Sequence, residues 1–273
     1  MKPLSRRDIL KLGGAGFLAA AFAPALRALQ STPANNVLAW GSKRQPKVAL
    51  TVDDCYLAHI MQRMEKTLQA NPQARVTFFP VGEALVSTNG KDPGIWKRIR
   101  DAGHDIGYHS FNHDDLATYS ADEVFRDYDR WLKALGHVLE DENPKVRFAR
   151  PPYGNVTPQF LDLCNQRGLV CTMWSWGWGS GIPGDRGAVI LDNAKEAITN
   201  LVPKTKPGQI ILMHARAYSA DAETLESGIP WLAEHKLRAV TLSEMYYDLQ
   251  KEEHQSAGCD VDASPSLTRT CIE

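Results

Sequence analysis

Two adjacent carboxylates and two closely spaced imidazoles are the side chains of this sequence best suited to metal chemistry. Asp53 directly precedes Asp54, and His113 follows His109 after three intervening residues. Two imidazoles one helical turn apart can bind the same ion. Adjacent aspartates point in different directions, so one can bind the ion while the other accepts a proton. Each pair alone also fits a simpler interpretation, as solvated carboxylates or as a capping or surface pair of histidines.

Other side chains could complete such a site. Arg150 precedes a rigid Pro-Pro pair and His214 follows an apolar run. Arg150 could simply close a salt bridge, and His214 could be a satisfied core histidine. Trp174, Trp176 and Trp178 are spaced by two and flanked by glycine. Each tryptophan alone could be a core residue, but the spacing favours a loop surface on which sugar rings stack.

The elements around these residues alternate between apolar runs typical of buried strands and segments with helical spacing. The expected strands are residues 47–52, 74–81, 104–110, 146–149, 169–176, 209–213 and 238–242. The expected helices are residues 57–70, 94–102, 120–139, 157–167, 191–201 and 222–235, the third opened by a capping box of Ser120 and Glu123. This order indicates an α/β fold, a single distorted (β/α) barrel of about seven parallel strands. A doubly wound open sheet is the alternative, although no GxGxxG follows the first strand to favour it.

The candidate residues follow the expected strands. The paired aspartates follow the first strand, the histidine pair the third, Arg150 the fourth, the tryptophans the fifth and His214 the sixth. The carboxyl ends of parallel strands carry the active sites of barrel enzymes. Unrelated surface charges would not all be expected at the carboxyl ends of the strands, so the sequence predicts one catalytic site there.

Four motifs in this order resemble those of the NodB-homology polysaccharide deacetylases, carbohydrate esterase family 4. The motifs are Thr51-Val52-Asp53-Asp54, His109-Ser110-x-x-His113, Arg150-Pro151-Pro152-Tyr153-Gly154 and Leu212-x-His214. The resemblance extends over about residues 48–242 and includes the segments 77–82 and 103–107. It implies a distorted (β/α) barrel of the glycoside hydrolase/deacetylase type.

The resemblance implies that Asp54, His109 and His113 hold one divalent ion with open coordination positions. Such an ion polarises an amide carbonyl and lowers the pKa of a bound water. Zinc is favoured by the ligand types, while cobalt, nickel or iron also accept two imidazoles and a carboxylate. Asp53 is then the base that takes the proton from water, and Arg150 orients Asp53.

The resemblance also implies how the oxyanion and the leaving group are handled. The backbone N–H of Tyr153 helps to stabilise the oxyanion, and His214 protonates the departing amine. Leu212 and a tryptophan line the pocket for the acyl methyl group, with Trp174, Trp176 and Trp178 as the candidates.

Two departures from the family pattern concern the site directly. Cys55 follows the paired aspartates where the family usually has glycine, which adds a thiol close to the metal. The fourth family motif, Asp-x-x-Asp-Trp, is missing, and Trp174 to Gly181 stand in its place. The first aspartate of that motif supports the catalytic histidine. His214 therefore lacks this usual partner, and Asp185, the nearest downstream carboxylate, is the candidate substitute.

Composition excludes several classes of protein. The chain has 43% hydrophobic residues, and 31 Lys and Arg against 32 Asp and Glu give a formal net charge of −1. An ordinary apolar content with little net charge argues against disorder. The absence of a basic excess argues against a nucleic-acid binder driven by bulk charge.

The N-terminus resembles an export signal. Ser5-Arg6-Arg7-x-Ile9-Leu10-Lys11 matches the twin-arginine pattern. The uncharged residues 12–26 are fewer than the roughly 20 of a membrane span, and Ala23-Pro24-Ala25 or Ala28 offers a cleavage site. We expect export by the twin-arginine machinery, a periplasmic or secreted mature protein, and no stable membrane anchor after cleavage.

The expected organisation has four parts. They are a signal peptide (1–28), a linker (29–45), a NodB-like deacetylase domain (46–249) and a polar C-terminal tail (250–273). Cys259 and Cys271 in the tail are candidates for a disulfide, although spacing alone cannot fix the pairing of five cysteines.

These features predict a metal-dependent hydrolase that acts on non-peptide carbon–nitrogen bonds. It would remove N-acetyl, or O-acetyl, groups from an extracytoplasmic poly- or oligosaccharide. One alternative is a hydrolase of another small amide on the same fold. Another is a catalytically weak carbohydrate-binding homologue, against which the presence of metal, base and acid residues argues.

Overall fold

The computed structural model describes residues 37–178, 194–215 and 220–256. These residues belong to one compact unit that spans residues 37–273. The expected signal peptide, Asp185 and the pair Cys259 and Cys271 lie outside the described residues. Within the described part of the chain, no helix combines the length and apolar character that a membrane span requires.

The centre of the fold is β1 (Lys47–Asp54), which is buried from Val48 to its end. A strand buried on both faces explains why this segment of the sequence is a nearly continuous apolar run. The other strands are β2 (Thr77–Pro80), β3 (Asp105–Ile106), β4 (Phe148–Ala149), β5 (Val170–Cys171), β6 (Trp176–Gly177), β7 (Ile210–His214) and β8 (Arg238–Val240). β1 pairs in parallel with β2, β7 and β8, while β3 pairs with β2 and β6 with β7. β4 and β5 form a separate parallel pair.

Isolated backbone bridges link the two sheets into a distorted barrel. They join Tyr108 with Ala149, Leu38 with Thr172, and Trp40 with Gln209. The first connects the chain after β3 to β4, and the other two place residues 38–40 between β5 and β7. Every pairing between the named strands is parallel. The predicted α/β fold, a distorted barrel of parallel strands, is therefore confirmed.

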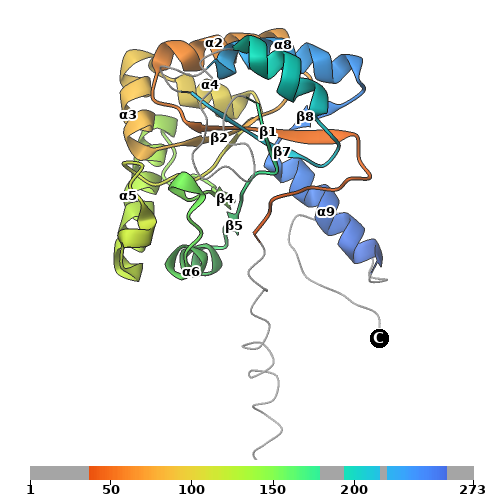
Figure 1. The fold of residues 1–273 in the computed structure, drawn as a ribbon. Coiled ribbons are helices and arrows are strands. Elements are labelled where there is room, and N and C mark those ends of the chain that lie inside the picture. The colour runs from red at the N-terminus through yellow and green to blue at the C-terminus, as the bar shows by residue number, and fades with distance from the viewer. Residues whose placement is uncertain (1–36, 179–193, 216–219, 257–273) are drawn as a thin grey trace, which may run out of the picture. The chain divides into compact units, whose positions relative to one another are not determined.

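Helices surround these strands (Figure 1). They are α2 (Ala58–Ala70), α3 (Gly82–Lys91), α4 (Ile95–Asp101), α5 (Ala121–Leu139), α6 (Pro158–Arg167), α7 (Ala194–Glu196), α8 (Asp221–Glu234) and α9 (Leu242–Ser256). A π-helical turn, Ala197–Leu201, continues α7. α2 packs beside α8, and α3 packs against α5 (Figure 1).

Local sequence signals set the ends of two helices as expected. The Ser120 N–H donates to the Glu123 carboxylate over 2.7 Å, which is half of the predicted capping box at the start of α5. The Thr157 hydroxyl caps α6 by accepting from the Phe160 N–H. α6 ends at Gly168, whose φ of 67° is in the left-handed region that favours glycine.

The sequence analysis did not predict α3, because its first turn depends on tertiary contacts. No side chain caps this helix. Instead, the N–H groups of Gly82 and Glu83 donate to the carbonyls of Ser110 and Phe111 over 3.1 and 2.9 Å. The Phe111 ring also fills the place where a side chain at Gly82 would lie, 2.3 Å from an added Cβ. Both contacts are with residues distant in the sequence, so the sequence of residues 82–91 gives no local signal for the start of this helix.

The strand expected over residues 169–176 is divided into β5 and β6. The N–H of Thr172 donates to Ala149 in β4 over 2.8 Å, whereas that of Ser175 donates to Ile210 in β7 over 2.9 Å. The chain thus changes its pairing partner between these residues, which interrupts the strand.

The chain continues past β8 into α9, a helix that the sequence analysis did not predict. The expected boundary between domain and tail, at residue 250, falls inside this helix. The Lys47 ammonium at the start of β1 pairs with Glu244 at 2.9 Å and Asp248 at 2.5 Å on α9. These ion pairs tie the helix to the central strand.

Candidate active site

Three candidate ligands meet at the carboxyl ends of β1 and β3. Asp54 is the last residue of β1, and His109 and His113 lie in the loop that follows β3. Asp54 Oδ1 is 3.5 Å from His109 Nε2 and 3.2 Å from His113 Nε2. One ligand atom from each residue lies within 4.8 Å of the other two. A carboxylate and two imidazoles that converge in this way suit a divalent transition-metal ion.

A backbone contact fixes the tautomer of His109. Its Nδ1 lies 2.8 Å from the carbonyl oxygen of Arg150. Because a carbonyl oxygen can only accept a hydrogen bond, Nδ1 carries a proton, and in the neutral ring Nε2 is the nitrogen left to bind a metal. Metal-bound histidines are usually held by such a contact at the other ring nitrogen.

The electrostatics of the three residues favour a cation. Burial opposes ionisation of Asp54, but hydrogen bonds from His109 and His113 outweigh it and hold the pKa of Asp54 well below its ordinary value. Burial also opposes protonation of His109, yet the charges of Asp53 and Asp54 raise its pKa. The negative field that favours a proton on His109 equally favours a divalent cation, so the residues fit a metal.

The expected base, Asp53, lies beside this set and is held by Arg150. Arg150 is fully buried, and its Nη1 donates to Asp53 Oδ1 over 2.7 Å and to Thr51 Oγ1 over 2.9 Å. Nε and Nη2 donate to the carbonyls of Thr172 and Met173 over 3.2 and 3.1 Å. The other carboxylate oxygen, Asp53 Oδ2, points toward the metal set and is 3.8 Å from His109 Nε2. A charge-assisted hydrogen bond therefore fixes one oxygen of Asp53 and leaves the other facing the site.

The backbone around the site is strained. Five of its non-glycine residues have positive φ angles: Asp54 (68°), Cys55 (63°), Ser110 (62°), His113 (65°) and Tyr153 (60°). Such conformations cost about 1–3 kcal/mol each and cluster at functional sites. The only other described residues with this property are two exposed surface residues.

Tyr153 covers the outer side of His113. It lies in a short 3₁₀ turn, Pro152–Gly154, and is 65% exposed. Its ring meets the His113 ring edge-on with 4.7 Å between the centroids, and its hydroxyl donates to the His113 carbonyl. The role of its backbone N–H at an oxyanion stays a prediction.

His214 ends β7 directly beside Asp53, its partner in register on β1. Charge on the His214 imidazole contributes to the lowered pKa of Asp54, after the hydrogen bonds of His109 and His113 and the charge of His109. The N–H of His214 donates to the carboxylate of Asp221, a residue 1% exposed at the start of α8. The expected partner of His214 was Asp185, not Asp221, although a carboxylate at the start of the helix after this strand is visible in the sequence.

The structure corrects the expectation for Trp178. This side chain is fully buried, and its Nε1 donates to Thr205 Oγ1 over 2.9 Å. Its ring lies so close to Gly228 that a Cβ there would come within 2.4 Å. Trp178 is a core residue, so the prediction that it stacks with a sugar ring is wrong.

The other expected pocket residues differ in their surroundings. Trp176 is half-buried, and its Nε1 donates to the Leu201 carbonyl over 3.1 Å. Trp174 is half-buried and lies 5.7 Å from the Arg150 guanidinium. Leu212 is buried in β7, two residues before the end of the strand. Trp174 therefore lies beside Arg150, the residue expected to orient the base.

Cys55 packs into the core. Its side chain is fully buried, with Sγ 3.7 Å from the Val52 carbonyl oxygen. Burial raises the pKa of the Cys55 thiol well above its ordinary value, with Asp54 and Asp53 contributing. The thiol faces the core, and Cys55 is not among the converging donors Asp54, His109 and His113.

Together, the barrel and these side chains define a hydrolase with a candidate divalent-metal centre. A family model described as polysaccharide deacetylase matches residues 41–172. The chain is 30% identical over 215 residues to a peptidoglycan-N-acetylglucosamine deacetylase of Bacillus cereus, covering 76% of this chain and 70% of that protein. The chain belongs to the polysaccharide deacetylase family, which is carbohydrate esterase family 4 with NodB homology.

Three further proteins show how much of the sequence and the fold this chain shares with known deacetylases and their relatives. The chain is 27% identical over 205 residues to the peptidoglycan-N-acetylglucosamine deacetylase PgdA of Listeria monocytogenes, but spans only 40% of that protein. A solved structure of the Bc1960 peptidoglycan N-acetylglucosamine deacetylase has a TM-score of 0.64 and 25% identity, covering 77% of this chain and 92% of that one. The pseudoenzyme BA3943 of Bacillus anthracis has the same TM-score at 21% identity, covering 78% and 69%. At 21% identity, the similarity to BA3943 shows a shared fold and nothing about activity.

The geometry predicts that both histidines are needed to hold the metal. Changing His109→Ala or His113→Ala removes one of three converging donors, so metal bound after loading and desalting should fall from one ion per chain to near zero. Elemental analysis measures this directly. The exposed His59→Ala is the matched control and should keep the wild-type content. Unchanged metal in both site variants would contradict the assignment.

Proposed function

We propose that this chain hydrolyses N-acetyl groups on an acetylated saccharide outside the cytoplasm. The main support for the proposal is that a candidate base, Asp53, and a candidate acid, His214, lie together beside one set of metal ligands. Asp53 is aimed by a buried arginine, and His214 lies next to it on the adjacent strand. The resemblance of the chain to peptidoglycan-N-acetylglucosamine deacetylases supports an N-acetylated sugar as the substrate.

Asp54, His109 and His113 would hold the metal ion, and zinc suits two imidazoles and a carboxylate. When bound there, a divalent ion supplies Lewis-acid polarisation of the amide carbonyl and activation of water. Cobalt, nickel and iron accept the same donors, and the metal content of the protein as isolated would distinguish these ions. Measurement of a different native metal would overturn the choice of zinc but not the site.

Asp53 would remove a proton from the attacking water with Oδ2, because Oδ1 is taken up by Arg150. His214 would deliver a proton to the departing amine nitrogen. Asp221 accepts the backbone N–H of His214, which supports a fixed position for the end of β7. A base and an acid on neighbouring strands can act in successive steps on one bound amide.

The second candidate function is hydrolysis of an O-acetyl ester or another small amide at the same site. The altered fourth motif favours it, because the tryptophan segment differs from the family pattern where substrate would be met. A binding protein without efficient catalysis is the third candidate, and a pseudoenzyme occurs among proteins of this fold. The presence of Asp53, Arg150 and His214 in one cluster supports catalysis instead.

The acid and base roles predict different losses on two substrates. With metal loaded, Asp53→Asn should lose about 10²–10⁴-fold of turnover on both an acetyl amide and an activated acetyl ester, because the amide side chain cannot accept the proton. His214→Ala should lose a similar factor on the amide only, because an activated ester leaves as an anion without a proton. Acetate release from saccharides of several lengths is the measurement.

Two results would contradict these roles. If His214→Ala lost turnover equally on the amide and the ester, His214 would not be the group that protonates the leaving amine. Wild-type turnover in Asp53→Asn, at full metal content, would remove the base role. Tyr246→Phe on α9, outside the described site, is the control for nonspecific effects of substitution and should keep both activities.

We also propose that the chain is exported by the twin-arginine route, on the motif at Arg6 and Arg7. Replacing both with lysine should keep the precursor in the cytoplasm, as cell fractionation would measure. Arg44→Lys, downstream of the expected cleavage site, is the matched control and should not change export. Normal appearance of the Arg6→Lys, Arg7→Lys variant outside the cytoplasm would point to the general secretion route.

A further inference from the structure

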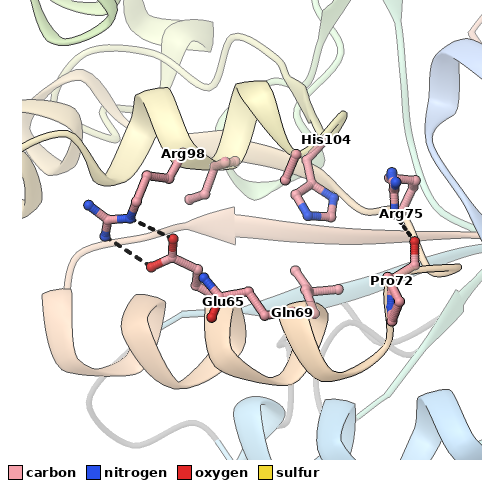
Figure 2. Close-up of a pocket in the computed structure, with 9 residues that line it drawn as sticks. Glu65, Gln69, Pro72, Arg75, Arg98 and His104 are labelled. Atoms are coloured by element: carbon pink, nitrogen blue, oxygen red, sulfur yellow. Dashed lines mark hydrogen bonds and ion pairs between the residues drawn. The ribbon is translucent and has the colours of Figure 1, made fainter.

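A pocket lies at the end of the barrel opposite to the metal-ligand set. It is a cavity of about 220 Å³ between α2 and α4, lined in part by Arg75 and His104 (Figure 2). These residues come just before β2 and β3, whereas the catalytic candidates follow the strands. Because the strands are parallel, the two sites lie at opposite ends. The pocket has no part in the proposed reaction.

His104 presents a hydrogen-bond donor to this cavity. The side chain is 8% exposed, and its Nδ1 accepts from the Val76 N–H over 3.2 Å. Nε2 therefore carries the proton. Burial, with a contribution from Arg75, lowers the pKa of His104 to about 4, so the ring is neutral at neutral pH. Among the residues that the structure describes, none accepts a hydrogen bond from Nε2.

Arg75 brings a positive charge to the same end of the cavity. Its Nη1 donates to the backbone carbonyls of Pro72 and Ala74. Within the described part of the chain, no carboxylate lies within ion-pair distance of this guanidinium. Gly103 has a φ of 84°, and a Cβ there would lie 3.1 Å from Arg75 Nε. The glycine thus leaves room for the arginine, and an uncompensated cation faces the cavity beside a neutral N–H donor.

The other end of the cavity has the opposite character. Glu65 pairs with Arg98 through two hydrogen bonds of 2.7 and 3.0 Å (Figure 2). Arg98 also donates to Asp92 over 2.9 Å, so its charge is already compensated. Between the two ends, Leu68 and Ile99 form apolar walls. A ligand with a negative group at both ends would meet the Glu65 carboxylate, whereas one negative group and a short apolar chain would match the cavity.

We propose that this pocket binds a short aliphatic monocarboxylate, with its carboxylate on Arg75 and His104 and its chain against Leu68 and Ile99. Guanidinium and imidazole N–H groups together satisfy the two oxygens of a carboxylate. The cavity is smaller than the roughly 300–1,000 Å³ of sites for drug-sized ligands, which limits the ligand to a few carbon atoms.

The test is a titration of the full metal-loaded protein with butyrate, followed by NMR of its labelled histidine rings. The His104 ring signal should shift saturably with butyrate, and neither 1-butanol nor succinate should bind comparably. Arg75→Gln should weaken binding about tenfold or more, because it removes a charged hydrogen-bond donor. Arg100→Gln is the matched control, since Arg100 lies on the same helix as Arg98 but pairs with Asp101 outside the pocket.

Three results would overturn the proposal. They are no shift of His104, wild-type affinity in a folded Arg75→Gln variant, or equal binding of 1-butanol. Butyrate bound at the catalytic metal instead would shift His109 and His113 without His104, and would also count against it. Thermal denaturation checks the fold of each variant. Because the readout is ligand binding, the result does not depend on deacetylase activity.

Discussion

The buried ion pair between Arg150 and Asp53 is the interaction on which the rest of the site depends. Arg150 donates to Asp53 on β1 and to two carbonyls after β5, and its own carbonyl accepts from His109. One residue thus orients Asp53, the proposed base, fixes the tautomer of His109, a candidate metal ligand, and holds the chain between β5 and β6. Complete burial lowers the pKa of Arg150 even though Asp53 opposes this effect. Removing one partner of such a pair typically costs about 3–5 kcal/mol, since the other is left buried and uncompensated.

The site also stores strain that the barrel must offset. Asp54, Cys55 and His113 have left-handed backbone conformations that place adjacent side chains in opposite surroundings. Asp54 faces the two imidazoles, whereas the Cys55 thiol packs in the core behind them. The Ser110 hydroxyl accepts from the His113 N–H over 2.9 Å and stabilises one of these turns. The departure from glycine at position 55 therefore changes the core under the site without adding a metal donor.

The sequence was informative where local pattern determines structure. β1 with its two terminal aspartates and the capped start of α5 followed from periodicity and local signals, and the set of Asp54, His109 and His113 followed from the resemblance of the motifs to the deacetylase family. Tertiary contacts decided the rest. The backbone carbonyls that begin α3 come from a distant loop, and the depth of Trp178 depends on its packing against Gly228. The Asp221 carboxylate was visible in the sequence, but its contact with His214 depends on the start of α8 lying beside the end of β7. Residue types alone do not determine any of these contacts.

A double-mutant cycle would show whether Arg150 acts in the proposed catalysis through Asp53. Acetate release would be measured for metal-loaded wild type, Asp53→Asn, Arg150→Met and the double variant, each with folding and metal content verified. If Arg150 works by aiming Asp53, its loss should cost little further turnover once Asp53 is already Asn, so the double variant should match the slower single variant. Losses that multiply in the double variant would show that the two residues act independently and would contradict the account.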